Sequence, residues 1–201
     1  MPPARRVGSA TSKTRVGILD AAERIMLEDG YAAVSSRSVG ARAGIHAGNV
    51  HYYFPTLDDL FVAILDRGAE RNMERMAAAL ASPQPLKALW GLSSDPRGVA
   101  VLNELMAAAN HRKALYSRVA ALAQTARRMQ IEALRALVPQ YGLDESLFPP
   151  ELLAAAIQGV ALLVVREDAL GVDTDHEAAR KAAEALIDHL ETRRDLNSGS
   201  R

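Results

Sequence analysis

The sequence predicts an all-α protein of about nine helices, and three observations support this prediction. The 201 residues are 49% hydrophobic but only 4% aromatic, a composition rich in alanine, leucine, arginine and glutamate that favours helix over sheet. Apolar residues recur at helical spacing along most of the chain, and no segment shows the sustained alternation of a strand. Proline and glycine separate the periodic segments from one another.

The first helix is expected to run from Lys13 to Gly30. Residues 1–12 precede it, and their proline, glycine and serine content is typical of a flexible tail. The apolar residues of this helix fall on one face: Ile18, Leu19, Ala22, Ile25 and Met26. Gly30 can end the helix with a left-handed cap, because glycine adopts a positive φ without strain.

A second, short helix can begin at Ser35 or Ser36, because a serine hydroxyl accepts hydrogen bonds from the unpaired amides of a first turn. Gly44 supplies the turn that ends it, and a third helix is expected over Ala47–Tyr53, before Pro55. Two helices joined by a glycine-containing turn within about twenty residues form the helix-turn-helix pattern. Six residues are expected to be the core that joins these helices: Val34, Val39, Ala43, Ile45, Val50 and Phe54.

A long fourth helix is expected from Thr56 to Ala81, opened by a capping box between Thr56 and Asp59 and ended by the prolines that follow. Five further helical segments are predicted at Leu86–Leu92, Pro96–His111, Lys113–Val138, Pro149–Gly171 and Asp175–Arg194. The predicted domains are therefore a helix-turn-helix unit (residues 13–56) and a helical bundle (residues 57–194), followed by a C-terminal tail (residues 195–201).

The net charge of zero hides an asymmetry along the chain. Residues 1–56 carry seven basic and four acidic side chains, a net charge of +3, so the rest of the chain carries −3. A basic end next to a helix-turn-helix is the expected nucleic-acid-facing end.

Several functional classes are disfavoured by what the sequence lacks. It has no cysteine, its five histidines do not have the spacing of metal ligands, and no glycine-rich phosphate loop or activated serine appears. We therefore expect no catalytic residues, no metal and no cofactor. The longest apolar run, Leu152–Val165, is shorter than the roughly 20 residues that span a bilayer, and the N-terminus lacks a secretory signal. A cytoplasmic protein without a membrane partner is expected.

The segment Ser35–Leu60 resembles the DNA-binding motif of the tetracycline-repressor (TetR) family of transcriptional regulators. Three features lie in fixed register: the turn Ala41-Arg42-Ala43-Gly44-Ile45, the sequence Tyr52-Tyr53-Phe54, and the acidic start of the next helix, Asp58-Asp59-Leu60. The motif covers about a quarter of the chain. Three positions depart from the family's usual residues: Gly40 replaces an alanine, His51 a tyrosine, and Leu57 a lysine that commonly reaches a DNA phosphate.

The resemblance implies a ligand-responsive regulator, most often a repressor, that binds double-stranded operator DNA. Nine residues are expected at the DNA interface: Ser36, Arg37, His46, Ala47, Gly48, Asn49, His51, Tyr52 and Tyr53. Arg37 can reach O6 and N7 of guanine, Asn49 can pair with N6 and N7 of adenine, and Ala47 can touch a thymine methyl group. The last three residues of the set suit phosphate or sugar contacts, although Tyr53 can equally serve packing. The arginines at positions 5 and 6 either reach a minor groove, as N-terminal arms do, or belong to a tail without contacts.

The resemblance also implies that a small molecule binds within the C-terminal bundle and shifts the long fourth helix. The candidate ligand-binding residues are apolar or polar side chains inside helices: Trp90, Asn103, Met106, Asn110, Tyr116, Met129 and Gln158. Trp90 is the leading candidate, because a large flat side chain suits ligand stacking.

The last two predicted helices are expected to pair with their copies as a four-helix bundle in a homodimer, because the first of them is apolar nearly all round. The expected interface residues are Leu153, Ile157, Val160, Val164, Leu186 and Leu190. Two recognition helices about 34 Å apart would then read a near-palindromic operator.

Two alternatives remain open. Nothing in a helix-turn-helix encodes the sign of the response, so an activator is compatible with the same residues. A helical protein-binding adaptor with weakened DNA binding is the second alternative, and Leu57 makes it more credible. The sequence identifies neither the effector nor the operator.

Overall fold

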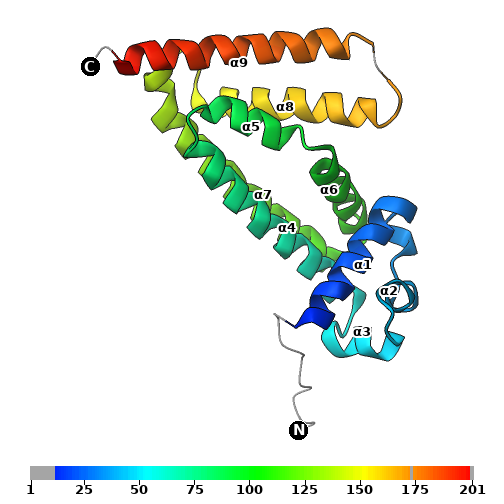
Figure 1. Ribbon diagram of the computed structural model, residues 1–201. Coiled ribbons are helices and arrows are strands. Elements are labelled where there is room, and N and C mark those ends of the chain that lie inside the picture. The colour runs from blue at the N-terminus through cyan, green and yellow to red at the C-terminus, as the bar shows by residue number, and fades with distance from the viewer. Residues whose placement is uncertain (1–11, 173, 200–201) are drawn as a thin grey trace. The chain divides into compact units, whose positions relative to one another are not determined.

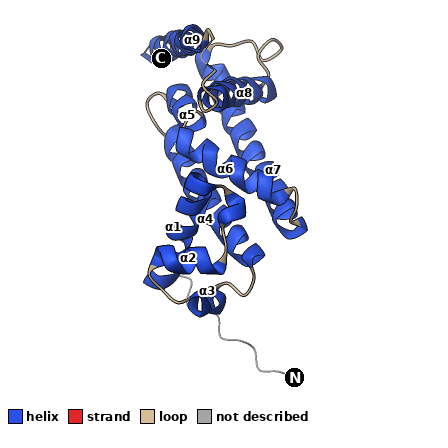
Figure 2. Ribbon diagram, turned by 90° about the vertical axis from the view of Figure 1, so that its right-hand side faces the viewer, coloured by secondary structure: helices blue, strands red, loops and turns tan. Residues whose placement is uncertain are grey.

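The computed structural model describes residues 12–172 and 174–199, and all regular structure in these ranges is helical (Figures 1 and 2). The predicted all-α fold is confirmed. The elements are α1 (Lys13–Asp29), η1 (Tyr31–Ala33), α2 (Ser36–Ala43), α3 (Ala47–Tyr53), α4 (Leu57–Leu80), α5 (Pro85–Ser93), α6 (Pro96–Ala109), α7 (Lys113–Leu137), η2 (Val138–Tyr141), α8 (Pro150–Asp168) and α9 (His176–Gly199). No helix in the described ranges has both the length and the apolar character needed to cross a membrane.

The predicted helices all exist, but some of their ends differ. The third helix has its predicted bounds, whereas α8 ends at Asp168, before the predicted Gly171. The C-terminal tail predicted from residue 195 is wrong for its first part, because α9 continues to Gly199. The residues after Arg194 contain no proline, and no glycine before Gly199, to stop the helix. The N-terminal tail with arginines 5 and 6 lies outside the described residues.

The chain divides into two compact units, and α4, α6 and α7 contribute residues to both. The first unit contains the chain up to Glu70 together with Ala100–Ala121, and the second contains Arg71–Val99 with the chain from Leu122 onward. The first unit is larger than the predicted helix-turn-helix domain, because the start of α4 supplies part of its core. The buried residues of this core include Ile18, Leu19, Met26, Val39, Val50, Phe54, Leu60, Phe61 and Ile64.

The end of α1 shows why the backbone of Gly30 differs from the predicted cap. Gly30 has a φ of 81°, as expected, but its ψ of 163° is extended and not left-handed helical. The next amide, that of Tyr31, donates to the Glu104 carboxylate of α6 at 2.7 Å. The direction of the chain after α1 therefore gives the Tyr31 amide a hydrogen-bond acceptor, Glu104, that lies 73 residues away in the sequence.

Charged side chains hold the start of α4 within the first unit. Arg67 donates to Asp20 at 2.6 Å and also to Glu23, both on α1, and the Arg67 side chain is only 14% exposed. Arg112, which precedes α7, pairs with Asp58 in the first turn of α4. Ion pairs that are partly removed from water are less screened than surface pairs, so these contacts help to fix the orientation of α4 on the helix-turn-helix.

In the second unit, α5 packs against both α8 and α9 (Figure 1). The buried core here includes Met76, Leu86, Leu89, Trp90, Leu134, Tyr141, Ala154, Ala161 and Ile187. Glu191 of α9 is also buried, at 1% exposure. Its carboxylate accepts from the amides of Leu86 and Lys87 at 2.8 and 3.2 Å, and from the Tyr141 hydroxyl at 2.9 Å.

A histidine links the end of α8 to the start of α9. The two ring nitrogens of His176 lie 2.8 Å from Asp168 and 2.5 Å from Glu167, and the side chain is 9% exposed. Asp168 also accepts from Arg180, which is paired with Glu177 as well. Hydrogen bonds to Asp168 and Glu167 raise the pKa of His176 above its ordinary value of 6.5, because both carboxylates favour the charged ring.

We expect this histidine to make the stability of the protein depend on pH. Because the pKa of His176 is higher in the folded than in the unfolded chain, its stabilisation is complete below pH 6.5 and disappears as the pH rises through the folded value. Urea unfolding of the wild-type protein and of His176→Gln, compared at acidic and alkaline pH, measures this effect. The difference in unfolding free energy between the two proteins should shrink as the pH rises; a difference that is constant with pH would contradict the assignment.

Candidate nucleic-acid interface

Local hydrogen bonds define the helix-turn-helix as the sequence predicts. Ser35 caps α2: its hydroxyl accepts from the amide of Ser38 at 3.1 Å, and the Ser38 hydroxyl accepts from the amide of Ser35 at 2.9 Å. Gly44 ends α2 in the left-handed helical conformation, with φ 69° and ψ 30°. The predicted capping box at the start of α4 is also confirmed, because Thr56 and Asp59 exchange hydrogen bonds of 2.9 and 3.1 Å.

His46 caps α3, a role that the sequence did not suggest. Its Nδ1 accepts from the amide of Gly48 at 3.2 Å, which requires an unprotonated Nδ1 and leaves the proton of the neutral ring on Nε2. Histidine is not one of the usual capping residues, so this cap could not be predicted from the sequence. The capped helix turns its N-terminal residues Gly48 and Asn49 to solvent.

Gly40 allows α2 to approach the beginning of α3 closely. A Cβ atom at this position would lie 2.9 Å from the carbonyl oxygen of Ile45 and 3.2 Å from the amide nitrogen of Ala47, both backbone atoms. The unusual glycine is therefore explained by close packing against the turn and the start of α3.

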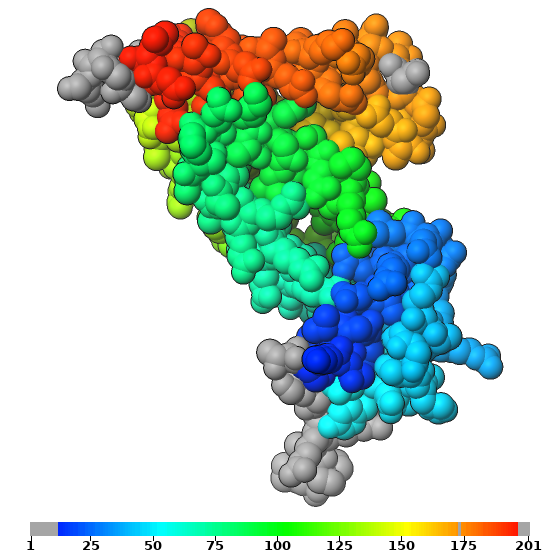
Figure 3. Space-filling model, viewed as in Figure 1, coloured from blue at the N-terminus to red at the C-terminus, as the bar shows by residue number. Residues whose placement is uncertain are grey.

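Most of the nine predicted DNA-interface residues are exposed, and they belong to α2, α3 and the turn between them. Figure 3 shows the surface of these helices. Arg37, His46, Gly48, Asn49, His51 and Tyr52 are exposed, whereas Ser36, Ala47 and Tyr53 are half-buried. The Tyr53 ring meets that of Tyr52 edge-on, with centroids 5.1 Å apart. Of the six predicted core residues, Val34, Val39, Val50 and Phe54 are buried, and Ala43 and Ile45 are only half-buried.

The two arginines of α2 differ in their availability. Arg42 donates to Glu28 of α1 at 2.6 Å and lies 3.9 Å from Asp29. Arg37 is exposed and has no ion pair within the described part of the chain. Its charge is therefore free to meet a phosphate or a base.

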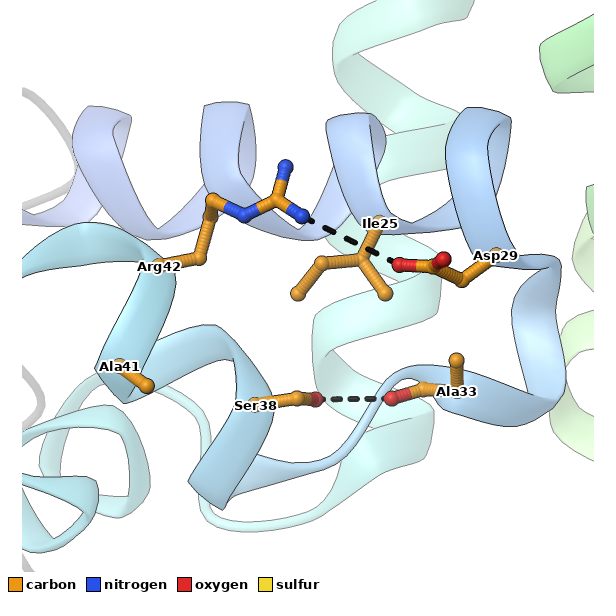
Figure 4. A pocket seen from close by; sticks show the side chains of 6 residues that line it. All are labelled: Ile25, Asp29, Ala33, Ser38, Ala41 and Arg42. Carbon is orange, nitrogen blue, oxygen red and sulfur yellow. Dashed lines mark hydrogen bonds and ion pairs between the residues drawn. The ribbon is translucent and has the colours of Figure 1, made fainter.

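A shallow groove of about 520 Å³ runs between α1 and α2, and Arg42 is one of the residues that line it (Figure 4). Its lining consists of Ile25, Asp29, Ala33, Ser38, Ala41 and Arg42. The Ser38 hydroxyl donates to the Ala33 carbonyl at 2.8 Å, so the polar lining is satisfied within the chain. No predicted DNA-interface residue lines this groove.

The predicted ligand-binding residues are not brought together in one cavity. Trp90 lines a cavity of about 180 Å³ in the second unit, and none of the other six does. Met129 packs against the core of that unit and Gln158 is exposed on α8. The other four belong to the first unit; Asn103 is half-buried, and three are exposed: Met106, Asn110 and Tyr116.

The predicted dimer residues divide into three groups by exposure. Val160 of α8 and Leu186 of α9 are 40% and 60% exposed, and so are available to a partner. Leu153, Ile157 and Leu190 are half-buried against their own core. Val164 is only 6% exposed and lines the cavity beside Trp90, so its side chain packs within its own chain. The exposed face of α8 includes two residues that the sequence did not single out, Leu152 and Leu163.

A capped recognition helix, exposed on a helix-turn-helix core and joined to a helical bundle, defines a DNA-binding regulator of transcription. The family model described as "Bacterial regulatory proteins, tetR family" matches residues 18–64. A solved member of the TetR family from Streptomyces coelicolor A3 is 32% identical, with a TM-score of 0.59, and the match covers 88% of this chain and 99% of that protein. The chain belongs to the TetR family.

Two further relatives carry more specific descriptions. The transcriptional repressor KstR of Mycolicibacterium smegmatis is 38% identical over 81 residues, a match that spans only 40% of this chain and 40% of the repressor. The structure of the multidrug binding protein EbrR, complexed with imidazole, is 31% identical with a TM-score of 0.56, over 88% of this chain and 96% of that protein.

Proposed function

We propose that this regulator is a repressor that binds a near-palindromic operator as a homodimer and leaves it when a small molecule binds. The observation that carries the proposal is the exposed surface of α2 and α3, where Arg37 has no ion-pair partner in the described residues and Asn49 is exposed. The sign of the response is supported by the KstR relatives, which are repressors. A cytoplasmic location follows from the proposal, since operator DNA lies there.

Within this proposal, the nine residues have separate tasks. Arg37, Ala47 and Asn49 read base edges, because their side chains fit guanine, the thymine methyl group and adenine. His51, Tyr52 and Tyr53 hold phosphate or sugar, as do Ser36 and His46. Gly48 has no side chain, so α3 can lie close to the bases there. The Nε2–H of His46 is available for a phosphate because Nδ1 is engaged in capping α3.

We expect Arg37→Ala to weaken binding of the preferred operator by about 1–3 kcal/mol and to relax one base position, since one bidentate base contact contributes about that much. The operator is first obtained by selecting bound duplexes from a random DNA library with the wild-type chain. Titration and a repeated selection with Arg37→Ala then measure affinity and specificity.

Arg71→Ala is the matched control, because Arg71 is also exposed and is not ion-paired with any described residue, but lies outside α2 and α3. It should leave the selected sequence unchanged, and both variants should unfold within about 0.5 kcal/mol of the wild type. Unchanged operator affinity and sequence preference for Arg37→Ala would remove Arg37 from the interface.

Release by a small molecule is supported by the imidazole complex of EbrR and by the cavity beside Trp90. The ligand must prefer the conformation that does not bind DNA, and a shift from 1:99 to 99:1 needs about a 10⁴-fold preference. The other predicted ligand residues, from Asn103 to Gln158, stay candidates for contacts in a ligand-bound state.

The homodimer is supported by the apolar face of α8. Leu152, Val160 and Leu163 lie on one side of this helix by their spacing, and each is at least 40% exposed. Large exposed apolar residues in a row mark an interaction surface, and symmetric pairing is the commonest arrangement.

We expect Leu186→Glu to weaken the dimer by at least about 2 kcal/mol, or roughly 30-fold in dissociation constant, because a charge would be buried at the interface. Sedimentation across a micromolar concentration range measures this change. Leu102→Glu, an exposed leucine of α6, is the control and should sediment like the wild type. A wild-type chain that is monomeric at micromolar concentration would rule the homodimer out.

An activator and a protein-binding adaptor are the competing functions. The adaptor is favoured by Leu57, which is half-buried and offers no charge to a phosphate. A gel-shift with DNA from upstream of the chain's own coding region separates these functions: an adaptor does not retard it, whereas a repressor and an activator both do and differ in a reporter assay.

A further inference from the structure

We propose that the cavity beside Trp90 binds a small organic cation, with the Glu184 carboxylate as its counter-ion. This inference rests on the proposed function only in calling the molecule an effector; the binding itself is independent of DNA. The cavity has a volume of about 180 Å³ and lies between α5, the start of α6, α8 and α9. Its lining residues are Trp90, Ser94, Pro96, Ala161, Val164, Val165, Asp168, Arg180 and Glu184.

The polar lining residues differ in whether they already have a partner. Both carboxylate oxygens of Asp168 are engaged, one by His176 at 2.8 Å and one by Arg180 at 2.9 Å. The Ser94 hydroxyl donates to the carbonyl of Trp90 at 2.8 Å. The Glu184 carboxylate is exposed and makes no hydrogen bond or ion pair with any residue that the structure describes.

The charge balance of the lining is negative. Two carboxylates face one guanidinium, and Arg180 is already shared between Asp168 and Glu177. The Lys87 ammonium interacts electrostatically with Glu184, but it donates its hydrogen bond to the Asp188 carboxylate at 2.7 Å. The Glu184 carboxylate, which makes no hydrogen bond or ion pair with a described residue, therefore favours a cation over an anion or a neutral molecule.

The remaining lining suits the apolar part of such a cation. An indole attracts a cation to its face, and Trp90 is the sole tryptophan of the chain. Ala161, Val164, Val165 and Pro96 supply apolar walls. The volume is comparable with an apolar cavity of roughly 150 Å³ that holds benzene, so the ligand class is an ammonium with about four to six carbon atoms.

Three compounds that share a tert-butyl group test the charge preference: tert-butylammonium, tert-butanol and pivalate. Each is titrated into the full-length chain at constant ionic strength, and binding is followed by Trp90 emission and by calorimetry. We expect saturable binding of tert-butylammonium, and binding of the alcohol and the carboxylate at least tenfold weaker. Glu184→Gln should weaken the cation about tenfold and bring it close to the alcohol, whereas Glu132→Gln, an exposed carboxylate of α7 outside the lining, should change nothing.

The inference is wrong if tert-butylammonium shows no saturable binding by either method, if the alcohol or pivalate binds as tightly, or if Glu184→Gln and Glu132→Gln behave alike. Operator binding, measured separately on the selected DNA, distinguishes this failure from that of the proposed function. A chain that binds its operator but not the cation overturns the cavity assignment alone. A chain that binds the cation as expected but no DNA supports the assignment and overturns the proposed repressor.

Discussion

Replacing Glu191 by alanine is expected to lower the free energy of unfolding by about 3–5 kcal/mol, because each buried donor that loses its acceptor costs about 1–3 kcal/mol. The Glu191 carboxylate is 1% exposed and satisfies the amides of Leu86 and Lys87 and the Tyr141 hydroxyl. No side chain of its own segment caps α5, since Gln84 at the capping position makes no such bond. The variant would leave three donors without an acceptor, two of them buried. Urea unfolding measures the loss.

Two further variants make this expectation specific. Tyr141→Phe removes one donor and keeps the carboxylate, so it should cost only about 1–2 kcal/mol. Burial and the hydrogen bond to Glu191 raise the pKa of Tyr141, as expected for a phenol that belongs to this network. Glu132→Ala, on the exposed face of α7, should change stability by less than about 0.5 kcal/mol. A Glu191→Ala variant as stable as Glu132→Ala would show that α5 does not depend on this cap.

Glu191 also shows which part of the fold could not be predicted from the sequence. The helices themselves are local: apolar periodicity, the capping box of Thr56 and Asp59, and the glycine that ends α2 are each encoded within a few residues. In the sequence, Glu191 is one more charged residue of an amphipathic helix. Its partner, the amide of Leu86, lies 105 residues away. Only the packing of α9 against α5 turns it into a cap.

The difference between local signals and long-range contacts also separates the predicted DNA-interface residues from the cavity beside Trp90. The DNA-interface residues follow from a motif in which neighbours in sequence are neighbours in space, so exposure of Arg37 and Asn49 agrees with expectation. The cavity beside Trp90 is lined by residues of four helices, and of the predicted ligand-binding residues only Trp90 lines it. Glu184 could not be predicted as a lining residue, because nothing in the local sequence distinguishes it from other exposed glutamates. The sequence predicts Val164 at the dimer face, because apolar character alone does not say which side of α8 is already covered by other helices of the same chain.

We expect Gly40→Ala to weaken operator binding at least tenfold while the protein still folds. The added Cβ would lie 2.9 Å from the Ile45 carbonyl oxygen and 3.2 Å from the amide nitrogen of Ala47. Both are backbone atoms, so relief requires the turn and α3 to move, and a recognition helix displaced by a few tenths of an ångström loses base contacts of about 1–3 kcal/mol each. The overpacking cost of about 1–3 kcal/mol is partly offset by the helix propensity that alanine gains over glycine.

Gly17→Ala separates the steric effect from the change in propensity. A Cβ at Gly17, inside α1, meets nothing within 4 Å, so this substitution should stabilise the protein by about 0.5–1 kcal/mol and leave operator affinity unchanged. Urea unfolding and titration of the selected operator, applied to both variants, test the pair. If Gly40→Ala bound the operator as tightly as Gly17→Ala, the close approach of α2 to α3 would not be what sets the position of the recognition helix, and the family's usual alanine at position 40 would fit this chain equally well.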